Sequence, residues 1–342
     1  MEKVSIIVPV YNMGCKLEKS IGSLINQTYS NIEILLIDDG STDNSLEECR
    51  RLEKSDSRIK VYHTENRGSG PARNYGIENA TGEYLYFPDA DDYIGPDTIK
   101  IMVQYARDTD TDIVICGFTY INQRTGKIAF TKKYIYTEIT GDEIRNNYAF
   151  YKIGSPNHGF CGAPWNKLFK KTVIDKNQLV YPPLRRHQDE AFIAKFFGCC
   201  EKIVFIEDVL YTYYFNDIKA EWSKYPTDYI DVANGLFKER KSNVLTWNPD
   251  DKDTKNMIYC EFINNTIKAL ELSFSPKFNF NKKQRKMWIK DKITNSEIMY
   301  IELPKTLGKY QRLIMLIIKK KCWTVLYYSL KSKIAIWDSF LK

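Results

Sequence analysis

Cysteine and histidine are scarce in this sequence. Its 342 residues include 8 cysteines and 3 histidines, and no two cysteines are spaced as C-x-x-C. A disulfide scaffold needs a denser set of cysteines, and a structural zinc site needs paired Cys or His ligands. The scarcity therefore excludes a disulfide scaffold, argues against a structural zinc site and favours the reducing cytoplasm.

Long hydrophobic runs are also missing. The longest candidate, residues 313–318, is followed directly by three lysines, whereas a helix that spans a bilayer needs about 20 apolar residues. Residues 1–3 lead into the apolar run 4–10 without the long apolar core and small-residue cleavage site of a signal peptide. We therefore predict no transmembrane helix, and a β-strand at residues 4–10.

The remaining composition is that of an ordinary globular protein, with 43% hydrophobic and 27% charged residues. The length allows one large domain or two smaller ones. The net charge of +7 is unevenly spread along the chain. Residues 276–342 hold 16 Lys and Arg against 4 Asp and Glu, a net charge of +12, which leaves −5 for residues 1–275. The body of the protein is thus mildly acidic and its C-terminal segment is strongly basic.

Short β-rich runs alternate with helical stretches up to about residue 117. This alternation is typical of a parallel sheet with crossover helices, and near-continuous apolar runs are typical of strands covered on both faces. Ligands of such open sheets bind at the carboxyl ends of the strands. We predict strands at residues 4–10, 32–37, 58–62, 84–87 and 112–116, and helices at about 14–27, 43–55, 69–80 and 96–107.

The rest of the chain has an irregular part and a helical part. The irregular part contains Tyr-rich runs, among them a predicted strand at 209–215, and one clear helix near 189–197. Apolar residues recur later at helical spacing, at 257–274, about 305–319 and about 322–336. We predict an α/β domain over residues 1–225, with halves 1–117 and 118–225, and a helical C-terminal region over residues 226–342.

Acidic residues follow the second predicted strand, in the run DDGSTD at residues 38–43. A carboxylate at this position faces the ligand crevice and can accept hydrogen bonds from a ribose or a base. The alternative is an ordinary helix N-cap, where Asp and Ser are common. The first strand lacks the G-x-G-x-x-G run of nicotinamide enzymes, and Gly68-Ser69-Gly70 is only a weak match to it.

Three carboxylates, Asp89, Asp91 and Asp92, lie within four residues at the end of a buried predicted strand. Their mutual repulsion costs stability unless a cation binds, and Mg²⁺ and Mn²⁺ prefer oxygen ligands completed by phosphate and water. The run suggests a metal that bridges protein and diphosphate, and the alternative is an Asp-rich turn before the following helix. Upstream, Arg73 near a helix N-terminus is either a phosphate partner or a solvated helix arginine.

A third acidic pair, Asp189 and Glu190, opens the helix predicted near 189–197. An acid in the first turn of a helix can simply complement the helix dipole. The functional alternative is a general base that removes the proton of an attacking hydroxyl. The preceding Trp165 and Asn166 would place an aromatic ring and an amide near an acceptor, or would pack in the core.

Together these motifs resemble those of a glycosyltransferase of family 2. The resemblance covers residues 4 to about 215, and it is specific as an ordered set. The set is VSIIVPVYN at 4–12, DDGSTD at 38–43, ARN at 72–74, GEYLYF at 82–87 and DADD at 89–92. The resemblance implies the GT-A fold, an α/β fold with a Rossmann-like, mostly parallel sheet. It also implies an inverting, metal-dependent enzyme that uses a nucleotide sugar, most often a UDP-sugar.

The resemblance assigns several side chains to the donor site. These are Pro9, Tyr11, Asp39, Arg73, Asp89, Asp91 and Asp92. The first three would contact uracil, and Arg73 would lie on the nucleotide side. Asp89 and Asp91 would serve the ribose and a divalent metal, Mn²⁺ or Mg²⁺, with Asp92 close by. No histidine follows His187 as a third metal ligand.

The resemblance also assigns the acceptor side. Asp189 matches the catalytic base of the family, although Gln188 stands before it where the family usually has Glu. Trp165, Asn166 and Glu190 are expected to contact the acceptor.

The basic segment 276–342 interleaves Lys-rich faces with tryptophan and tyrosine. A basic amphipathic helix with interfacial aromatics can lie on an anionic membrane surface. The alternative is a helical bundle with a solvated basic face. The acidic body and the lack of a recognition motif argue against nucleic acid as a partner.

The sequence thus predicts an inverting glycosyltransferase that moves a hexose or N-acetylhexosamine from a UDP-sugar to a hydroxyl of a glycan. We expect a lipid-linked acceptor at the cytoplasmic face of the cell membrane, as in the synthesis of capsule or exopolysaccharide. Two alternatives stay open: a sugar nucleotidyltransferase, which would release pyrophosphate, and a nucleotide-sugar-binding protein without catalysis.

Overall fold

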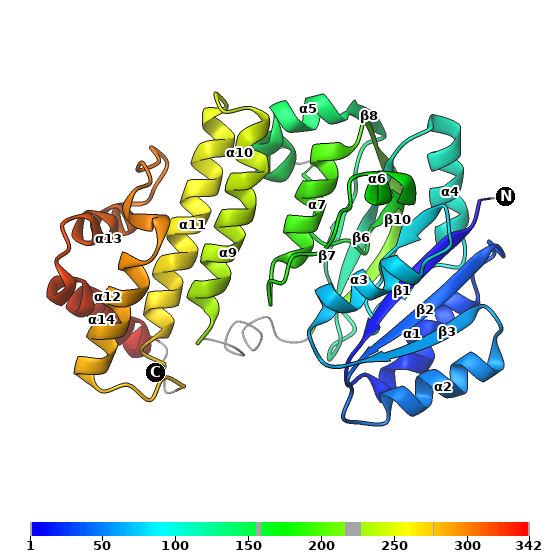
Figure 1. The fold of residues 1–342 in the computed structure, drawn as a ribbon, viewed down its shortest axis with the longest axis horizontal. Coiled ribbons are helices and arrows are strands. Elements are labelled where there is room, and N and C mark those ends of the chain that lie inside the picture. The colour runs from blue at the N-terminus through cyan, green and yellow to red at the C-terminus, as the bar shows by residue number, and fades with distance from the viewer. Residues whose placement is uncertain (1, 155–158, 216–226, 276, 341–342) are drawn as a thin grey trace. The chain divides into compact units, whose positions relative to one another are not determined.

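Figure 1 shows the fold in a computed structural model, which describes residues 2–154, 159–215, 227–275 and 277–340. The chain forms two compact units, Met1–Asp217 (unit 1) and Ile218–Lys342 (unit 2). Unit 1 combines helices with one ten-stranded sheet, and the described part of unit 2 is helical.

The first half of unit 1 alternates strands and helices. The strands are β1 Val4–Val10, β2 Ile32–Asp39, β3 Ile59–Thr64, β4 Tyr84–Tyr86 and the short β5 Tyr93–Ile94. The helices are α1 Gly14–Ile25, α2 Ser45–Ser55, α3 Ser69–Asn79 and α4 Thr98–Thr109. Strands β3, β2, β1 and β4 lie side by side in that order and run parallel. Their carboxyl ends therefore meet at one edge of the sheet.

The second half of unit 1 extends the same sheet. Its strands are β6 Ile113–Asn122, β7 Ile128–Lys132, β8 Thr137–Thr140, β9 Lys167–Lys170 and β10 Lys202–Phe215. Its helices are α5 Gly141–Asn146, the π-helical η1 Phe150–Gly154, α6 Lys171–Lys176 and α7 Gln188–Cys199. The sheet order is β3-β2-β1-β4-β9-β6-β10-β5, with β9 antiparallel to both of its neighbours. The predicted α/β fold with a mostly parallel sheet is confirmed.

The element bounds differ most from the prediction at β10. The sequence predicts a strand only at 209–215, whereas β10 begins at Lys202. Its pairing with β6 shifts register between Phe205 and Val209, around the acidic pair Glu207 and Asp208. This irregularity interrupts the hydrophobic pattern, and so the first half of the strand is hidden from a periodicity argument.

A close approach between α3 and β1 sets the position of α3. A Cβ atom at Gly76 of α3 would lie 2.2 Å from Cγ2 of Ile7 on β1. Only glycine fits at this distance, so α3 packs directly on the fully buried strand. Since α3 begins at Ser69, just beyond the carboxyl end of β3, its first turns lie at the ligand edge of the sheet.

Unit 2 consists of helices that pack through amphipathic faces. They are α9 Tyr229–Ser242, α10 Val244–Trp247, α11 Lys252–Leu272, α12 Lys282–Thr294, the 3-10 helix η2 Glu297–Met299, α13 Lys309–Lys319 and α14 Trp323–Phe340. The side chain of Asp251 caps α11, and Asn281 caps α12 in a capping box with Gln284. The predicted helical C-terminal region is confirmed.

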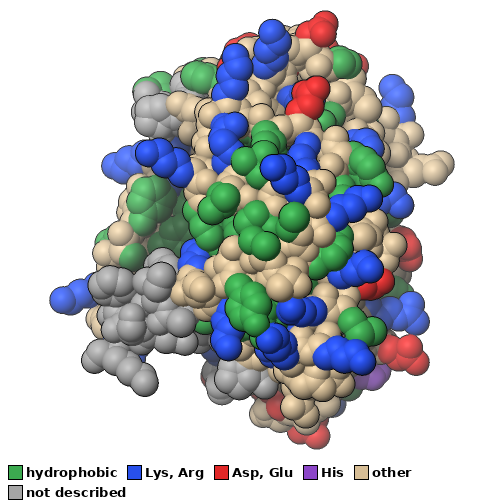
Figure 2. All heavy atoms as spheres, turned by 90° about the vertical axis from the view of Figure 1, so that its left-hand side faces the viewer, with side chains coloured by type: hydrophobic (Ala, Val, Ile, Leu, Met, Phe, Trp, Pro, Cys, Tyr) green, Lys and Arg blue, Asp and Glu red, His purple; other side chains and the backbone are tan. Residues whose placement is uncertain are grey.

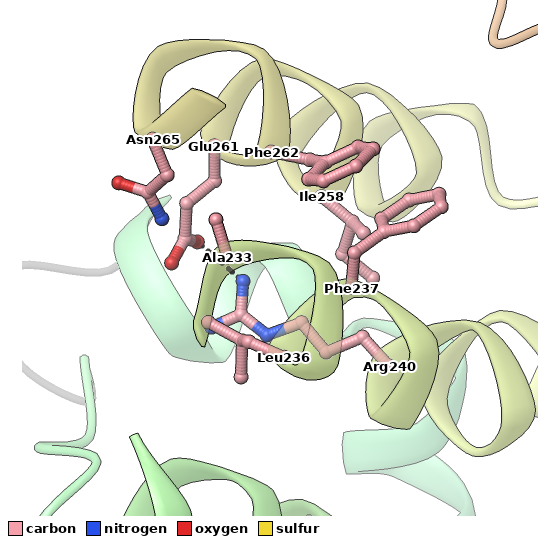
Figure 3. A pocket seen from close by; sticks show the side chains of 8 residues that line it. All are labelled: Ala233, Leu236, Phe237, Arg240, Ile258, Glu261, Phe262 and Asn265. Carbon is pink, nitrogen blue, oxygen red and sulfur yellow. Dashed lines mark hydrogen bonds and ion pairs between the residues drawn. The ribbon is translucent and has the colours of Figure 1, made fainter. Parts of the chain in front are cut away.

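A small pocket in unit 2 lies between α9 and α11 (Figure 3). The rings of Phe237 and Phe262 stack there at 4.0 Å between centroids. Arg240, 3% exposed, forms an ion pair with Glu261 across the same interface. The polar groups of the pocket thus bind each other, and we interpret it as packing between the two helices.

Two sequence-based exclusions can be compared with the structure. Within the described ranges, no helix is long and apolar enough to span a bilayer. The cysteines that the structure describes are free thiols.

Candidate functional site

The guanidinium of Arg73 binds two carboxylates that are far apart in the sequence. Its Nη2 donates to Oδ1 of Asp89 at 2.7 Å, and its Nη1 donates to Oδ1 of Asp189 at 2.8 Å. Asp89 follows β4, and Asp189 lies in the first turn of α7. Because the fork of Arg73 is planar and rigid, it fixes the spacing of the two acids. Arg73 is therefore a buried partner of two predicted site residues rather than a solvated helix arginine.

Further contacts join α3 to the segment that carries Asp189. The amide of Gln188 donates to Oγ of Ser69 at 2.7 Å. Asn74 exchanges two hydrogen bonds with the backbone of Tyr181, at 2.8 and 3.0 Å. The ring of Tyr181 then stacks on Phe192 of α7 at 4.0 Å between centroids. Helix α3 thus holds the first turn of α7 at the ligand edge through polar contacts on both sides of Arg73.

The surroundings of the two acids disfavour negative charge. Asp89 and Asp189 keep about a third of their side chains exposed, at 30% and 31%. Burial raises the pKa of Asp89 to about 6, although the nearby guanidinium of Arg73 opposes this shift. Burial also raises the pKa of Asp189 above its ordinary value, again opposed by Arg73. A carboxyl with a raised pKa is a stronger proton acceptor once it is ionised, as a general base requires.

Asp92 has a different environment from its neighbours. It is 3% exposed, and it accepts hydrogen bonds from Oη of Tyr211 at 2.6 Å and from the backbone N–H of Tyr214 at 2.9 Å. Burial, reinforced by the charge of Asp89, raises the pKa of Asp92, although its two hydrogen bonds oppose this shift. These contacts fasten the DADD run to β10, and the predicted donor contact of Asp92 stays a prediction.

Asp91 is the carboxylate of this run that faces a lysine. Its Oδ2 lies 3.0 Å from Nζ of Lys16, which belongs to the first turn of α1. The two side chains are 26% and 30% exposed.

The acidic run can be tested for its fit to a divalent metal. Oδ2 of Asp89 and Oδ1 of Asp91 form no hydrogen bond or ion pair with the described residues. Across that part of the chain, no group of three or more His, Cys, Asp or Glu side chains is arranged to hold a metal. Mg²⁺-type sites commonly use one or two carboxylates and take their other ligands from phosphates and water. The residues present therefore fit a metal that binds together with a diphosphate.

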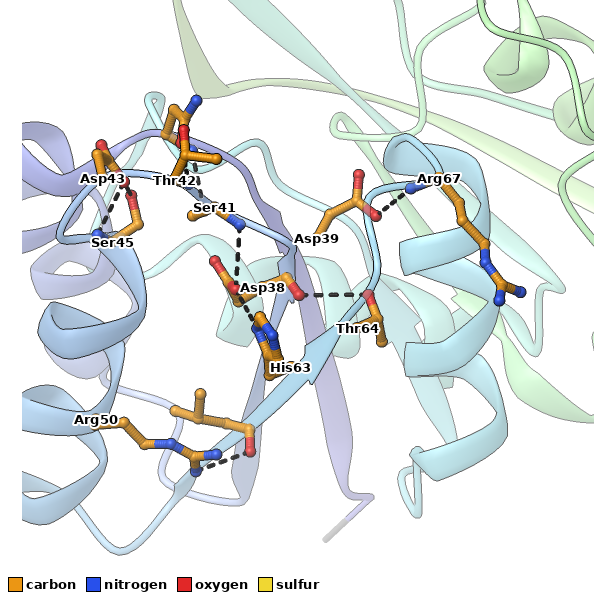
Figure 4. Close-up of polar contacts among 12 residues, drawn as sticks. Asp38, Asp39, Ser41, Thr42, Asp43, Ser45, Arg50, His63, Thr64 and Arg67 are labelled. Carbon is orange, nitrogen blue, oxygen red and sulfur yellow. Dashed lines mark hydrogen bonds and ion pairs between the residues drawn. The ribbon is translucent and has the colours of Figure 1, made fainter.

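The predicted uracil side of the site lies at the end of β2 (Figure 4). Asp39, 3% exposed, accepts hydrogen bonds from the backbone N–H groups of Arg67 at 2.9 Å and Gly68 at 2.8 Å. Asp38 points the other way and contacts Nδ1 of His63 at 2.7 Å. Asp39 thereby orders the loop that leads into α3, and it keeps further acceptor lone pairs for a ligand.

Two other predicted donor residues lie in β1 and just after it. Tyr11 exposes 45% of its surface beyond the end of β1, as a ring that stacks on a base requires. Pro9 is partly buried within β1. The backbone at Asn12 has a φ of 52° and places the amide oxygen of its side chain on the N–H of Thr42 at 2.8 Å. This contact joins the β1–α1 loop to the DDGSTD run.

The predicted acceptor residues differ in accessibility. Trp165 is 3% exposed and stacks on Tyr211 at 4.5 Å between centroids, and Asn166 is fully buried and donates to the backbone oxygen of Cys116 at 2.7 Å. Their burial favours a supporting role, and their acceptor contact stays a prediction. Glu190 is 24% exposed and lies 3.1 Å from Nζ of Lys152.

Sequence reasoning missed a buried lysine beside the acceptor side. Lys167 is fully buried, and its ammonium donates to the backbone oxygens of Cys161 and Ala163 and to Oδ1 of Asn166, each at 2.7 Å. Burial lowers the pKa of Lys167 to about 8. The lysine thus holds the loop before β9 in place. The run Trp165-Asn166-Lys167 gave no periodic or compositional signal for this role.

Comparisons with known proteins agree with this architecture. The sequence profile of the family described as Glycosyl transferase family 2 matches residues 5–176. Glycosyltransferase GlyG of Streptococcus pneumoniae is 32% identical over 308 residues, which cover 83% of this chain and 98% of that protein. The profile match and the similarity to GlyG show the family: the chain belongs to glycosyl transferase family 2, and it is a glycosyltransferase.

Solved structures show the same fold. This chain matches the crystal structure of S. aureus TarS in complex with UDP-GlcNAc with a TM-score of 0.67 and 21% sequence identity. The match covers 97% of this chain and 92% of the TarS chain. The mannosyltransferase PcManGT of Pyrobaculum calidifontis, in complex with GDP-Man and Mn²⁺, has a TM-score of 0.54 and 16% identity over 98% of this chain and 88% of that one. The predicted GT-A fold is confirmed.

We predict that Arg73→Met destabilises the protein most at neutral pH. Removing one partner of a buried ion pair costs roughly 3–5 kcal/mol, and we expect the lower end because the two carboxylates are partly exposed. Without the guanidinium, the pKa of Asp89 and Asp189 in the folded protein rises further above the pKa of an aspartate in the unfolded chain. The loss of stability is therefore present at pH values above the unfolded pKa and vanishes below it. Urea unfolding at pH 7 and at about pH 4, near the ordinary aspartate pKa, measures this.

The matched control for this change is Arg67→Met. Arg67 is 71% exposed, and among the described residues its guanidinium pairs with the exposed Glu65 at 3.4 Å, so its loss should change stability little at either pH. An equal loss of stability at both pH values in Arg73→Met would contradict the two-carboxylate role of Arg73.

Proposed function

We propose that this glycosyltransferase inverts the anomeric centre of a UDP-sugar, with Asp189 as the general base. The observation that carries the proposal is the pair of ion pairs at Arg73, which places Asp189 beside Asp89 of the donor-side DADD run. An in-line displacement requires a general base on one side of the reacting carbon and the residues that bind the donor on the other side. The family membership of the chain supports the same reaction type.

The donor is a nucleoside diphosphate sugar, and we propose a UDP-hexose or UDP-N-acetylhexosamine. The exposed ring of Tyr11, together with Pro9 and Asp39, would contact the uracil at the ends of β1 and β2. Asp89 and Asp91 would contact the ribose and hold Mn²⁺ or Mg²⁺ together with the diphosphate. When bound, such an ion would neutralise the charge that develops on the departing diphosphate. The complexes of TarS with UDP-GlcNAc and of PcManGT with GDP-Man and Mn²⁺ support this choice.

The reaction is a single displacement at the anomeric carbon. An acceptor hydroxyl attacks that carbon, the bond to the phosphate oxygen breaks, and the electron pair leaves with UDP. Asp189 takes the hydroxyl proton as the new glycosidic bond forms. Arg73 keeps the carboxylate of Asp189 in place during this step, and its positive charge opposes the rise in the pKa of Asp189 that burial causes.

Asp189→Asn should abolish transfer and leave nucleotide binding intact. The amide keeps the shape of the carboxyl but cannot accept the proton, and loss of a general base lowers the rate by about 10²- to 10⁴-fold. UDP release from UDP-GlcNAc with water as the acceptor measures turnover, and calorimetric titration with UDP measures binding.

The matched control is Asp175→Asn, which makes the same chemical change at an ion pair with Lys171 on the surface of unit 1. This variant should turn over like the wild type. Unchanged turnover in Asp189→Asn would overturn the assignment of the base, and release of pyrophosphate rather than UDP in assays with a sugar phosphate and UTP would support a nucleotidyltransferase instead.

We further propose that the acceptor glycan is lipid-linked and that unit 2 contacts the cytoplasmic face of the membrane. Helix α13 exposes Leu313 and Leu316 at 54% and 46%, and α14 exposes Val325 at 52%. Lysines flank these apolar side chains in the sequence, at positions 309, 319, 320 and 321. Figure 2 shows the face of unit 2 where hydrophobic side chains gather with Lys and Arg among and around them.

Exposed apolar side chains flanked by lysines favour contact with an anionic bilayer over exposure to water. Exposed leucines favour the boundary between headgroups and acyl chains, and each nearby Lys or Arg contributes on the order of 1 kcal/mol of attraction to anionic lipid. The acceptor in this proposal is a capsule or exopolysaccharide glycan on a lipid carrier in that membrane.

The double variant Leu313→Ser with Leu316→Ser should bind vesicles of phosphatidylcholine and phosphatidylglycerol roughly tenfold more weakly than wild type, because the apolar part of the contact is lost. Co-sedimentation measures the bound fraction. The control Ile128→Ser removes a side chain that is 65% exposed on β7 of unit 1, and it should leave binding unchanged. Equal binding by all three proteins would reject this docking face.

A further inference from the structure

Among the carboxylates of the DADD run, Asp91 has Lys16 as its cationic partner. Arg73 serves both Asp89 and Asp189, whereas Asp92 is held by Tyr211 and by backbone. Nζ of Lys16 lies 3.0 Å from Oδ2 of Asp91, and the hydrogen bond joins positions 75 residues apart. The contact therefore comes from the fold and not from neighbouring residues in the chain.

The position of Lys16 is unfavourable for a helix. It lies in the first turn of α1, where the partial positive charge of the helix N-terminus repels a cation. That turn contains no acidic residue to offset this repulsion. Asp43 accepts a hydrogen bond from the N–H of Gly14 at this helix end at 3.3 Å, and Asp91 adds a second negative charge that contacts Lys16 directly. Helix formation therefore does not explain a lysine at position 16, whereas its contact with Asp91 does.

Asp91 is also the carboxylate proposed to hold the metal. Its pair with Lys16 is partly open to water, at 30% exposure for the lysine and 26% for the aspartate, whereas the pair of Asp89 involves an arginine that is 2% exposed. A partly exposed ion pair is weak and is exchanged easily, but a buried one is not. Asp91 can therefore change partners while Asp89 keeps its arginine.

We propose that Lys16 and the divalent cation alternate at Asp91, and that the displaced ammonium of Lys16 then binds the diphosphate of the donor. This proposal rests on the proposed function. Without donor, Lys16 neutralises Asp91 and limits metal binding. With metal and donor present, the cation takes Asp91, and the flexible four-carbon stem of Lys16 leaves its ammonium available to an anion at the N-terminus of α1.

The exchange predicts opposite effects of one substitution on two ligands. Lys16→Met removes the competitor of the metal, so Mn²⁺ alone should bind about threefold to fivefold more tightly, the range expected from a weak, partly exposed ion pair. The same change removes a positive charge from the diphosphate, so UDP in the presence of saturating Mn²⁺ should bind several-fold more weakly. A lysine with only a structural role would not produce this opposition.

The experiment measures Mn²⁺ binding by electron paramagnetic resonance of the free ion, and UDP binding by calorimetry, with the full chain. Lys16→Arg should stay close to the wild type in UDP binding because it keeps the charge. The matched control is Lys19→Met, one turn along α1, whose ammonium lies 4.9 Å from the ring of Tyr214 and forms no ion pair with Asp91. It should leave both affinities unchanged.

The outcomes separate this proposal from the proposed function. Unchanged Mn²⁺ affinity in Lys16→Met, in a wild type that binds Mn²⁺, would overturn the exchange and leave the glycosyl transfer standing. Weaker binding of Mn²⁺ would also overturn it, because it would make Lys16 a support of the metal site. Absence of binding of Mn²⁺ alone in wild type and variant alike would overturn the exchange, and absence of Mn²⁺ binding in the presence of UDP would overturn the proposed metal as well. Thermal unfolding confirms that each variant folds, and Lys16→Gln replaces Lys16→Met if it does not.

Discussion

The guanidinium of Arg73 is the contact on which the rest of the candidate site depends. It is 2% exposed and binds Asp89, which follows β4, and Asp189 in the first turn of α7. Gly76 makes this possible, because α3 can pack against Ile7 of β1 only where a Cβ is absent. One glycine thus sets the position of a helix, the helix positions one arginine, and the arginine sets the spacing of two acids.

The aspartates of the DADD run and Asp189 are held by different partners, and each environment has a chemical consequence. Asp89 and Asp189 share a buried cation and keep partly open faces. Asp92 has a pKa raised by burial and serves as an anchor to Tyr211 of β10. Within the part of the chain that the structure describes, Asp91 pairs with Lys16, and both side chains are partly exposed. A bare cluster of four charges would be unstable, whereas this arrangement leaves room for a single divalent cation with a diphosphate.

Much of the fold could be predicted from the sequence, because buried parallel strands and amphipathic helices leave clear periodic patterns. The donor-side runs were also visible, since DDGSTD and DADD stand directly after strands. The contacts that join distant segments left no local signal: the bond between Arg73 and Asp189 spans 116 residues, and Lys16 lies 75 residues from Asp91. Burial of Trp165 and the irregular first half of β10 likewise depend on tertiary packing.

The central claim is that Asp189 activates a hydroxyl for a single displacement on the donor. The anomeric configuration of the product tests it most directly, and proton NMR of the new glycosidic linkage reads that configuration from the coupling of its anomeric proton. An α-configured UDP-sugar should yield a β-linked product. An α-linked product would contradict the account, because retention requires a second displacement or a different mechanism.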